Sequence, residues 1–303
     1  STHLPNGRCS RMITEFFDPL FVLLQQSPTL FITTLLVLGL LVGSFLNVVI
    51  YRLPVMMQRE WELEAAEILE QEPRVQTPFS LTTPASHCPK CKAPVKPWQN
   101  IPIVSWLLLG GKCALCKTPI SKRYPTIELV SGLMTAAVAW IFGWSDITLV
   151  LIPFMWVTLA LTMIDFDTQL LPDTLVMPLL WLGMLINISG TIVPLREAVV
   201  GAMAGYLSLW SVYWAFKLIT GKEGMGYGDF KLLAAFGAWF GWQALPLIIL
   251  LSAAVGAVVG IALMVILGRD KNIPIPFGPY LCGAAWVYVF FGPNIMTWYL
   301  GSY

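Results

Sequence analysis

The sequence is poor in charged residues: only 12% of its 303 residues are Asp, Glu, Lys or Arg, and 57% are hydrophobic. Soluble globular domains contain about 25% charged residues. This composition therefore excludes an ordinary soluble domain and indicates an integral membrane protein. No basic tail points to nucleic acid as a partner. Residues 1–27 also lack an apolar core followed by a small-residue cleavage site, so we expect no secretory signal there.

Long apolar stretches take the place of the missing charges. A membrane-spanning helix needs about 20 mainly apolar residues, and eight stretches of the chain are candidates. They cover residues 29–50, 126–144, 147–165, 174–193, 197–219, 229–243, 245–267 and 277–299. These stretches predict an all-α polytopic membrane protein with about eight transmembrane helices in a lipid bilayer. No internal repeat suggests an inverted-repeat transporter.

The basic residues indicate how the chain is oriented. With eight transmembrane helices, 15 of the 18 Lys and Arg residues fall on one side of the membrane. The positive-inside rule puts that side in the cytoplasm and both termini outside. We therefore expect a periplasmic segment (1–28), a first transmembrane helix (29–51), a cytoplasmic loop domain (52–124) and a seven-helix membrane domain (125–303). Within the loop, the acidic residues 58–72 predict a short surface helix that carries no chemistry.

Two CxxC pairs lie in the predicted loop domain. Cys88 and Cys91 are separated by 21 residues from Cys113 and Cys116. Four thiolates at this spacing are typical of a tetrahedral zinc site, and such a closed shell leaves no position for a reacting water. Two disulfides or free thiols are the alternatives, and a reducing cytoplasm disfavours disulfides. The sequence therefore predicts a structural Zn²⁺ that holds the loop together.

Aspartates occur where the apolar stretches begin or end. The candidates are Asp165, Asp167, Asp173 and Asp229, and carboxylates at membrane depth are usually functional. Asp165 ends the third predicted helix and Asp229 begins the sixth, so both are expected at the cytoplasmic face. Two adjacent carboxylates share a proton, and such a pair can hydrolyse a peptide by activating water. Ion or proton transport is an alternative, as are plain helix capping by Asp229 and exposure of Asp165 to water.

Five sequence motifs, in this order, resemble those of one family. They are GSFLNVVIYRLP (43–54), IPIVSW between the CxxC pairs (101–106), ISKRYPTIEL (120–129), IDFDTQLLPD (164–173) and GYGD (226–229). Together they resemble the bacterial type IV prepilin peptidases, which are bifunctional leader peptidases and N-methyltransferases of the GxGD class. The resemblance implies that Asp165 and Asp229 are catalytic, while Asp167 and Asp173 support them.

The same resemblance implies a substrate, a cofactor and a location. Its substrates would be type IV prepilins and the pseudopilins of type II secretion, cut after a glycine that ends a short basic leader. The new N-terminal residue, often Phe, would then be methylated with S-adenosylmethionine. The enzyme would lie in the bacterial inner membrane with its active site facing the cytoplasm, and could associate with the pilus or secretion assembly machinery.

The methyltransferase site is less readable, because the chain has no glycine-rich strand–helix motif for S-adenosylmethionine. The resemblance implies a site in the N-terminal half, where Arg52, Arg123 and Glu128 are candidates to bind the cofactor or the substrate amine. Arg52 and Arg123 could also simply mark the cytoplasmic interface. Two alternatives remain for the whole chain: a transporter that uses the paired aspartates, and a non-catalytic zinc-bearing scaffold.

Overall fold

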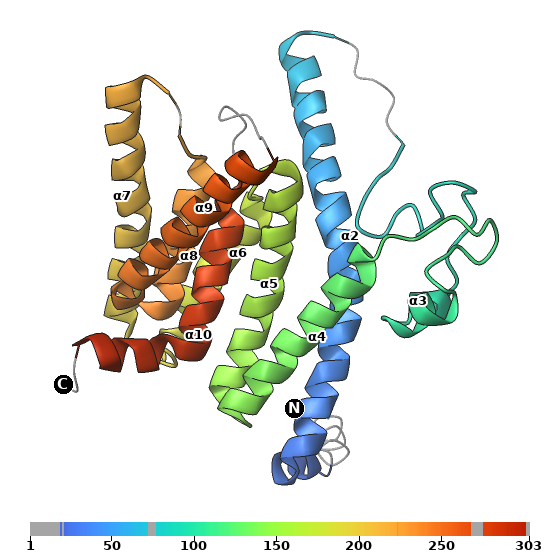
Figure 1. Ribbon diagram of the computed structural model, residues 1–303, viewed down its shortest axis with the longest axis horizontal. Helices are drawn as coiled ribbons and strands as arrows, with labels where there is room; N and C mark the ends of the chain where they lie inside the picture. The colour runs from blue at the N-terminus through green and yellow to red at the C-terminus, as the bar shows by residue number, and fades with distance from the viewer. Residues whose placement is uncertain (1–18, 20, 72–76, 223, 268–274, 301–303) are drawn as a thin grey trace, which may run out of the picture.

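The computed structural model describes residues 19, 21–71, 77–222, 224–267 and 275–300 (Figure 1). Most of the expected periplasmic segment 1–28 lies outside these residues. Within the described part there are eight helices of 14 residues or more and no β-strand longer than an isolated bridge. The long helices are α2 (Pro28–Ile68), α4 (Arg123–Phe142), α5 (Asp146–Thr168), α6 (Asp173–Ile186), α7 (Leu195–Thr220), α8 (Tyr227–Phe240), α9 (Leu245–Leu267) and α10 (Gly278–Leu300).

Each of the eight predicted stretches overlaps one of these helices, which confirms the all-α fold class. Five helical segments in the described residues are long and apolar enough to cross a bilayer. By contrast, α6 and α8 have only 14 residues each. Helices of that length extend about 21 Å, whereas the hydrocarbon core is about 30 Å thick. A count of eight complete spans therefore stays a prediction.

Helix α2 does not end where the first membrane span was expected to end. It runs for 41 residues and continues through Pro54, so the acidic stretch forms its far end rather than a separate helix. Membrane helices tolerate an internal proline where neighbouring groups compensate for the lost backbone bond. Beyond Arg52 the helix extends about 24 Å farther, at 1.5 Å per residue. Figure 1 shows this end of α2 extending past the neighbouring helices.

Helix α8 lies at the centre of the bundle formed by the C-terminal helices. Every residue from Asp229 to Phe240 is buried except Lys231, because α6, α7 and α10 cover the helix. The contact with α7 depends on two glycines of α7, Gly205 and Gly201. A Cβ on Gly205 would lie 2.6 Å from the carbonyl oxygen of Leu233. Gly201 lies against the backbone of Gly237 in the same way, so the two helices pack backbone to backbone.

Asn187, a fully buried residue at the end of α6, binds the C-terminal end of α8. Its Nδ2 donates to the carbonyl oxygens of Ala238 and Trp239, at 2.9 and 3.0 Å. Its Oδ1 accepts the N–H groups of Ile192 and Val193, both at 3.1 Å. The last carbonyls of a helix have no partner within the helix, and Asn187 provides partners for two of them inside the protein.

Candidate active site

Asp165 lies near the end of α5, where the chain leaves the membrane helix. The residue is buried, at 4% exposed. Its Oδ2 accepts a hydrogen bond of 2.9 Å from the backbone N–H of Gly278, the first residue of α10. A Cβ on Gly278 would lie only 2.7 Å from the same oxygen. A residue larger than glycine at position 278 would therefore displace the carboxylate.

Asp229 lies in the first turn of α8, three residues after the helix N-cap Gly226. It is also buried, at 7% exposed. The glycines of this segment differ in the space that they leave. A Cβ on Gly226 would meet only the Asp229 carboxylate, at 3.8 Å, whereas one on Gly228 would lie 2.8 Å from the Cβ of Leu171. Gly228 therefore makes room for a packed leucine, and Gly226 leaves the backbone open.

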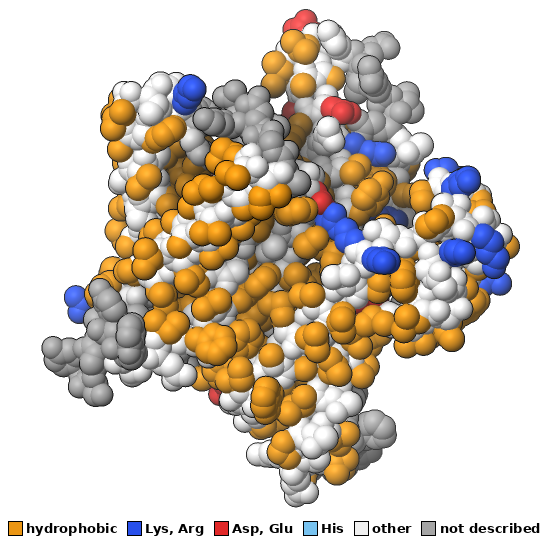
Figure 2. Space-filling model, in the orientation of Figure 1, with side chains coloured by type: hydrophobic (Ala, Val, Ile, Leu, Met, Phe, Trp, Pro, Cys, Tyr) orange, Lys and Arg blue, Asp and Glu red, His pale blue; other side chains and the backbone are white. Residues whose placement is uncertain are grey.

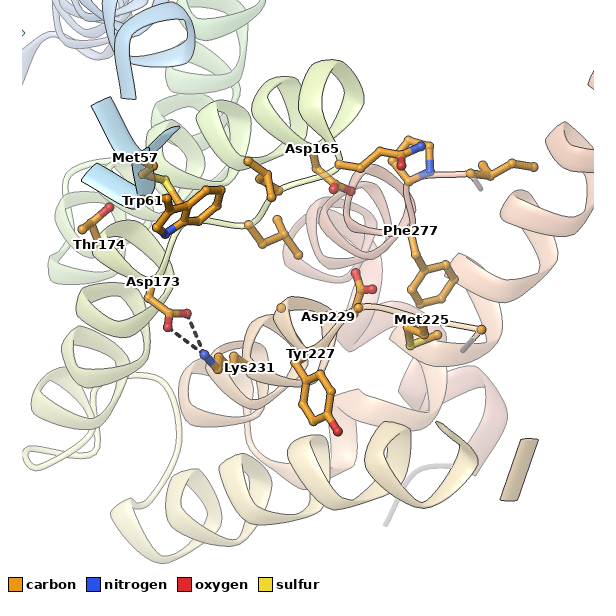
Figure 3. A pocket seen from close by; sticks show the side chains of 18 of the residues that line it. Met57, Trp61, Asp165, Asp173, Thr174, Met225, Tyr227, Asp229, Lys231 and Phe277 are labelled. Carbon is orange, nitrogen blue, oxygen red and sulfur yellow. Dashed lines mark hydrogen bonds and ion pairs between the residues drawn. The ribbon is translucent and has the colours of Figure 1, made fainter. Parts of the chain in front are cut away.

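The two carboxylates share one cavity of about 660 Å³. Figure 3 shows Asp165 and Asp229 on opposite sides of it, with both side chains directed into the cavity. Leu171, which follows α5, is another lining residue, and a Cβ on Gly278 would lie 3.2 Å from its Cδ2. Leu171 therefore packs against the glycine beside each acid. The two aspartates that the sequence pointed to are thus brought together at one end of the bundle.

The other two aspartates are engaged in ion pairs. Arg123 at the start of α4 binds Asp167 through both of its terminal nitrogens, and the Nη1–Oδ1 distance is 2.7 Å. Lys231 binds both oxygens of Asp173, at 2.9 and 2.7 Å (Figure 3). Both pairs are partly exposed to solvent. Asp165 and Asp229 have no basic partner among the described residues, so of the four candidate aspartates these two are the buried ones without an ion pair.

Part of the cavity wall comes from residues that the sequence did not single out. Met57, Glu60 and Trp61, on the extension of α2, line the cavity, as do Pro276 and Phe277 before α10. The expectation that residues 58–72 carry no chemistry stays a prediction, although Glu60 and Trp61 line the cavity. No signal in the sequence separates Glu60 from the other glutamates around it, because only the continuous helix α2 brings it to the cavity.

The four cysteines form one cluster. Their sulfur atoms all lie within 4.8 Å of one another. The Sγ distance is 3.7 Å from Cys88 to Cys116 and 3.9 Å from Cys91 to Cys113. A tetrahedral ion with Zn–S bonds of about 2.3 Å requires sulfurs about 3.8 Å apart, whereas a disulfide requires about 2.05 Å. The described cysteines are unbridged, and the donor set fits a metal ion. Hydrogen bonding with Thr118 lowers the pKa of Cys116 to about 6, which favours the thiolate form.

The two CxxC pairs are also alike in their backbone geometry. Both read CxxCKxP, and the N–H of each lysine donates to the carbonyl of the first cysteine, at 2.9 Å for Lys92 and 3.1 Å for Lys117. Both lysines have positive φ, near 58° and 57°, which non-glycine residues rarely adopt. The lysine and the proline that follow each CxxC pair are a repeat visible in the sequence that the prediction of the metal site did not use. The repeat produces two matching turns that direct four sulfurs to one point.

The three candidates for cofactor binding lie apart from the aspartate cavity. Arg52 is buried and donates to the carbonyls of Ser80 and Pro84, at 2.9 and 2.6 Å. Glu128 is buried in α4 and accepts the N–H of Ile103 at 2.7 Å. These bonds join the loop to α2 and α4, whereas the Arg123 ion pair described above joins α4 to α5. None of the three side chains lines the cavity of Asp165 and Asp229.

Comparison with known proteins gives two adjacent family matches. Residues 37–142 match the bacterial peptidase A24 N-terminal domain, and residues 152–261 match the type IV leader peptidase family. A prepilin leader peptidase/N-methyltransferase of Stutzerimonas stutzeri is 56% identical over 279 residues, which cover 91% of this chain and 96% of that protein. The proteins of the same name from Pseudomonas aeruginosa and Aeromonas hydrophila are 52% and 51% identical, over 93% and 91% of this chain and 98% and 96% of their own. No solved structure matches the chain. The chain therefore belongs to the type IV leader peptidase family and carries the bacterial N-terminal domain of that family.

Proposed function

We propose that this chain is a bifunctional membrane enzyme. It removes the leader peptide from type IV prepilins and type II secretion pseudopilins, and it then methylates the new N-terminal residue with S-adenosylmethionine. One observation carries the peptidase half: two buried carboxylates without a basic partner in the described residues share one cavity. The relatives named prepilin leader peptidase/N-methyltransferase match this chain over almost their whole length. This match supports both activities.

The cavity supports hydrolysis by a carboxylate pair without a covalent intermediate. Asp165 and Asp229 share one proton. The ionised carboxylate takes a proton from water as the water oxygen attacks the scissile carbonyl, and the protonated one donates to the carbonyl oxygen. Collapse of the tetrahedral intermediate then breaks the C–N bond, and the leaving amine takes up a proton. The products are the leader with a free carboxylate and the mature chain with a free amino group.

The charges around the cavity support an active site that faces the cytoplasm of an inner-membrane protein. Arg123 and Lys231 bind aspartates at the same end of the bundle as the two catalytic acids, and the positive-inside rule assigns that end to the cytoplasm. Prepilins and pseudopilins would present their leaders on this side. The pilus and type II secretion assembly machineries are then the proposed partners.

The N-terminal half carries the proposed methyltransferase part. Its four cysteines have the spacing and the number of thiolates that a structural Zn²⁺ requires. Such an ion would hold the loop in shape and would take no part in bond breaking. We assign Arg52, Arg123 and Glu128 to the binding of S-adenosylmethionine or of the substrate amine, since all three lie where the loop meets the membrane helices.

The first prediction concerns the two catalytic acids. Asp165→Asn and Asp229→Asn should each reduce leader cleavage by about 100-fold or more, because an amide can neither accept the proton nor donate it as a carboxyl group does. Asp173→Asn is the matched control, since Asp173 lines the same cavity but is bound to Lys231. The measurement is product mass from a purified prepilin in detergent, with and without S-adenosylmethionine. Unimpaired cleavage by both variants would show that Asp165 and Asp229 are not the catalytic acids.

The second prediction concerns Gly278. Gly278→Ala should lower kcat for cleavage by about tenfold or more with little change in KM, because its Cβ would displace the Asp165 carboxylate. Gly283→Ala is the matched control: it lies on the same helix, and a Cβ there would meet nothing within 4 Å. Methylation of a pre-cut pilin should persist in both variants, which shows that the chain is folded. Equal cleavage by the two variants would contradict the prediction.

The third prediction separates two roles of Glu128. Glu128→Gln keeps an oxygen that can accept the Ile103 N–H but removes the negative charge. If the carboxylate binds the substrate amine or takes its proton, methylation should fall about 100-fold while cleavage continues. Glu128→Leu should in addition release the loop. Normal methylation by Glu128→Gln, with loss only in Glu128→Leu, would show that Glu128 merely docks the loop.

The fourth prediction concerns the metal. Removal of Zn²⁺ by a strong chelator should abolish methylation before cleavage, because the cysteine cluster lies in the loop and the aspartates lie in the bundle. Added Zn²⁺ should restore methylation, which controls for damage to the protein. Loss of cleavage while methylation survives is the opposite result, and it would refute the proposed division between the two halves.

A further inference from the structure

The loop domain exposes apolar side chains on the short helix α3 (Val104–Leu108). Leu107 is 63% exposed and Leu108 is 78% exposed, and Ile101 and Val104 are about half exposed. In Figure 2 hydrophobic side chains gather along the lower edge of this domain, with lysines above them. Contiguous exposed apolar groups on a domain surface indicate a binding partner.

A hydrogen bond fixes the depth at which α3 begins. The carboxylate of Glu128 accepts the N–H of Ile103, the residue immediately before α3. In turn, Glu128 lies against α2 at Gly43, where a Cβ would be 2.7 Å from the Glu128 Cα. Gly43 is seven residues before Ile50, at the end of the apolar run of α2, and this corresponds to about 10 Å along the helix. Therefore α3 is attached beside the apolar part of α2 and α4, below the level where α4 begins.

The backbone at this attachment is constrained. Ile103 has φ of 59°, which is unusual for a β-branched residue. Such a conformation persists only where surrounding contacts hold it, and the Glu128 carboxylate provides one. The position of α3 is thus set by the fold and is not that of a free loop.

The positive charge of the segment around α3 is complementary to an anionic lipid surface. Residues 77–122 contain six lysines and no aspartate or glutamate. Anionic lipids give the cytoplasmic leaflet a negative surface, which attracts clustered lysines near the membrane. An apolar face at the acyl boundary with lysines at the headgroups is the arrangement of an interfacial anchor.

We propose that α3 and Ile101 form a wedge that inserts into the cytoplasmic leaflet beside α4. The lysines of residues 77–122 bind anionic headgroups around it. The wedge keeps the four-cysteine loop against the bilayer. The loop domain therefore contacts the membrane surface directly, in addition to its covalent connection to α2 and α4. The choice of leaflet rests on the proposed orientation, whereas the insertion itself rests on the geometry above.

Site-specific photocrosslinking in nanodiscs tests this proposal on the full chain. A benzophenone amino acid replaces Leu107 in one protein and Leu69 in the other. Leu69 is the matched control because it is 64% exposed, close to the value for Leu107, yet lies at the far end of α2. After irradiation, the mass of each protein reports lipid adducts, and leader cleavage by the same samples reports the folded state of the bundle.

We expect at least tenfold more lipid adduct at position 107 than at position 69 in nanodiscs that contain phosphatidylglycerol. In nanodiscs of phosphatidylcholine alone, the adduct at position 107 should fall several-fold, because the lysines lose their partners. Equal yields at the two positions, or a cross-link from position 107 to protein in place of lipid, would overturn the insertion. A yield at 107 that does not depend on anionic lipid would overturn the role of the lysines. Cleavage without lipid adduct at 107 would leave the proposed peptidase standing while the wedge fails.

Discussion

Two carboxylates without counterions have to be kept inside a membrane protein, and this constraint governs the arrangement of the rest. An isolated charge in an apolar environment is expensive. Here each acid lies at a helix end and lines one cavity. Asp165 is at the end of α5, and Asp229 is in the first turn of α8. The neighbouring Asp167 and Asp173 are paired with Arg123 and Lys231, so the buried pair are the two of these four aspartates that have no ion pair.

The two halves of the chain are more closely joined than their separate family matches indicate. Helix α2 belongs to the N-terminal half, yet its extension provides Glu60 and Trp61 to the cavity of the aspartates. Arg123, also in the N-terminal half, binds Asp167, which is two residues from Asp165. These contacts depend on membrane helices and not on the cysteine cluster. The geometry of the cavity can therefore survive changes in the loop, although it cannot survive loss of α2.

Patterns local in sequence predicted much of this structure. The eight apolar stretches correspond to eight helices, and the CxxC spacing led to four sulfurs within 4.8 Å of one another. Asp165 and Asp229 were identified from their positions at the ends of apolar runs and from the family motifs. The continuity of α2 was not predicted, because Pro54 and the polar residues after it look like a helix end. Gly278 had no signal in the sequence, since its role is a backbone N–H that meets a side chain 113 residues away.

Because α8 is short, Asn187 affects the position of Asp229 although it lies far from the cavity. With 14 residues, the helix extends about 21 Å and ends inside the protein, so its last carbonyls cannot reach water. Asn187 donates to two carbonyls at this end of the helix, and the glycines of α7 fix its lateral position against backbone atoms. With one end and one face fixed, the remaining end of α8 has little freedom to move along its axis. The depth of Asp229 relative to Asp165 thus follows from how the opposite end of α8 is capped.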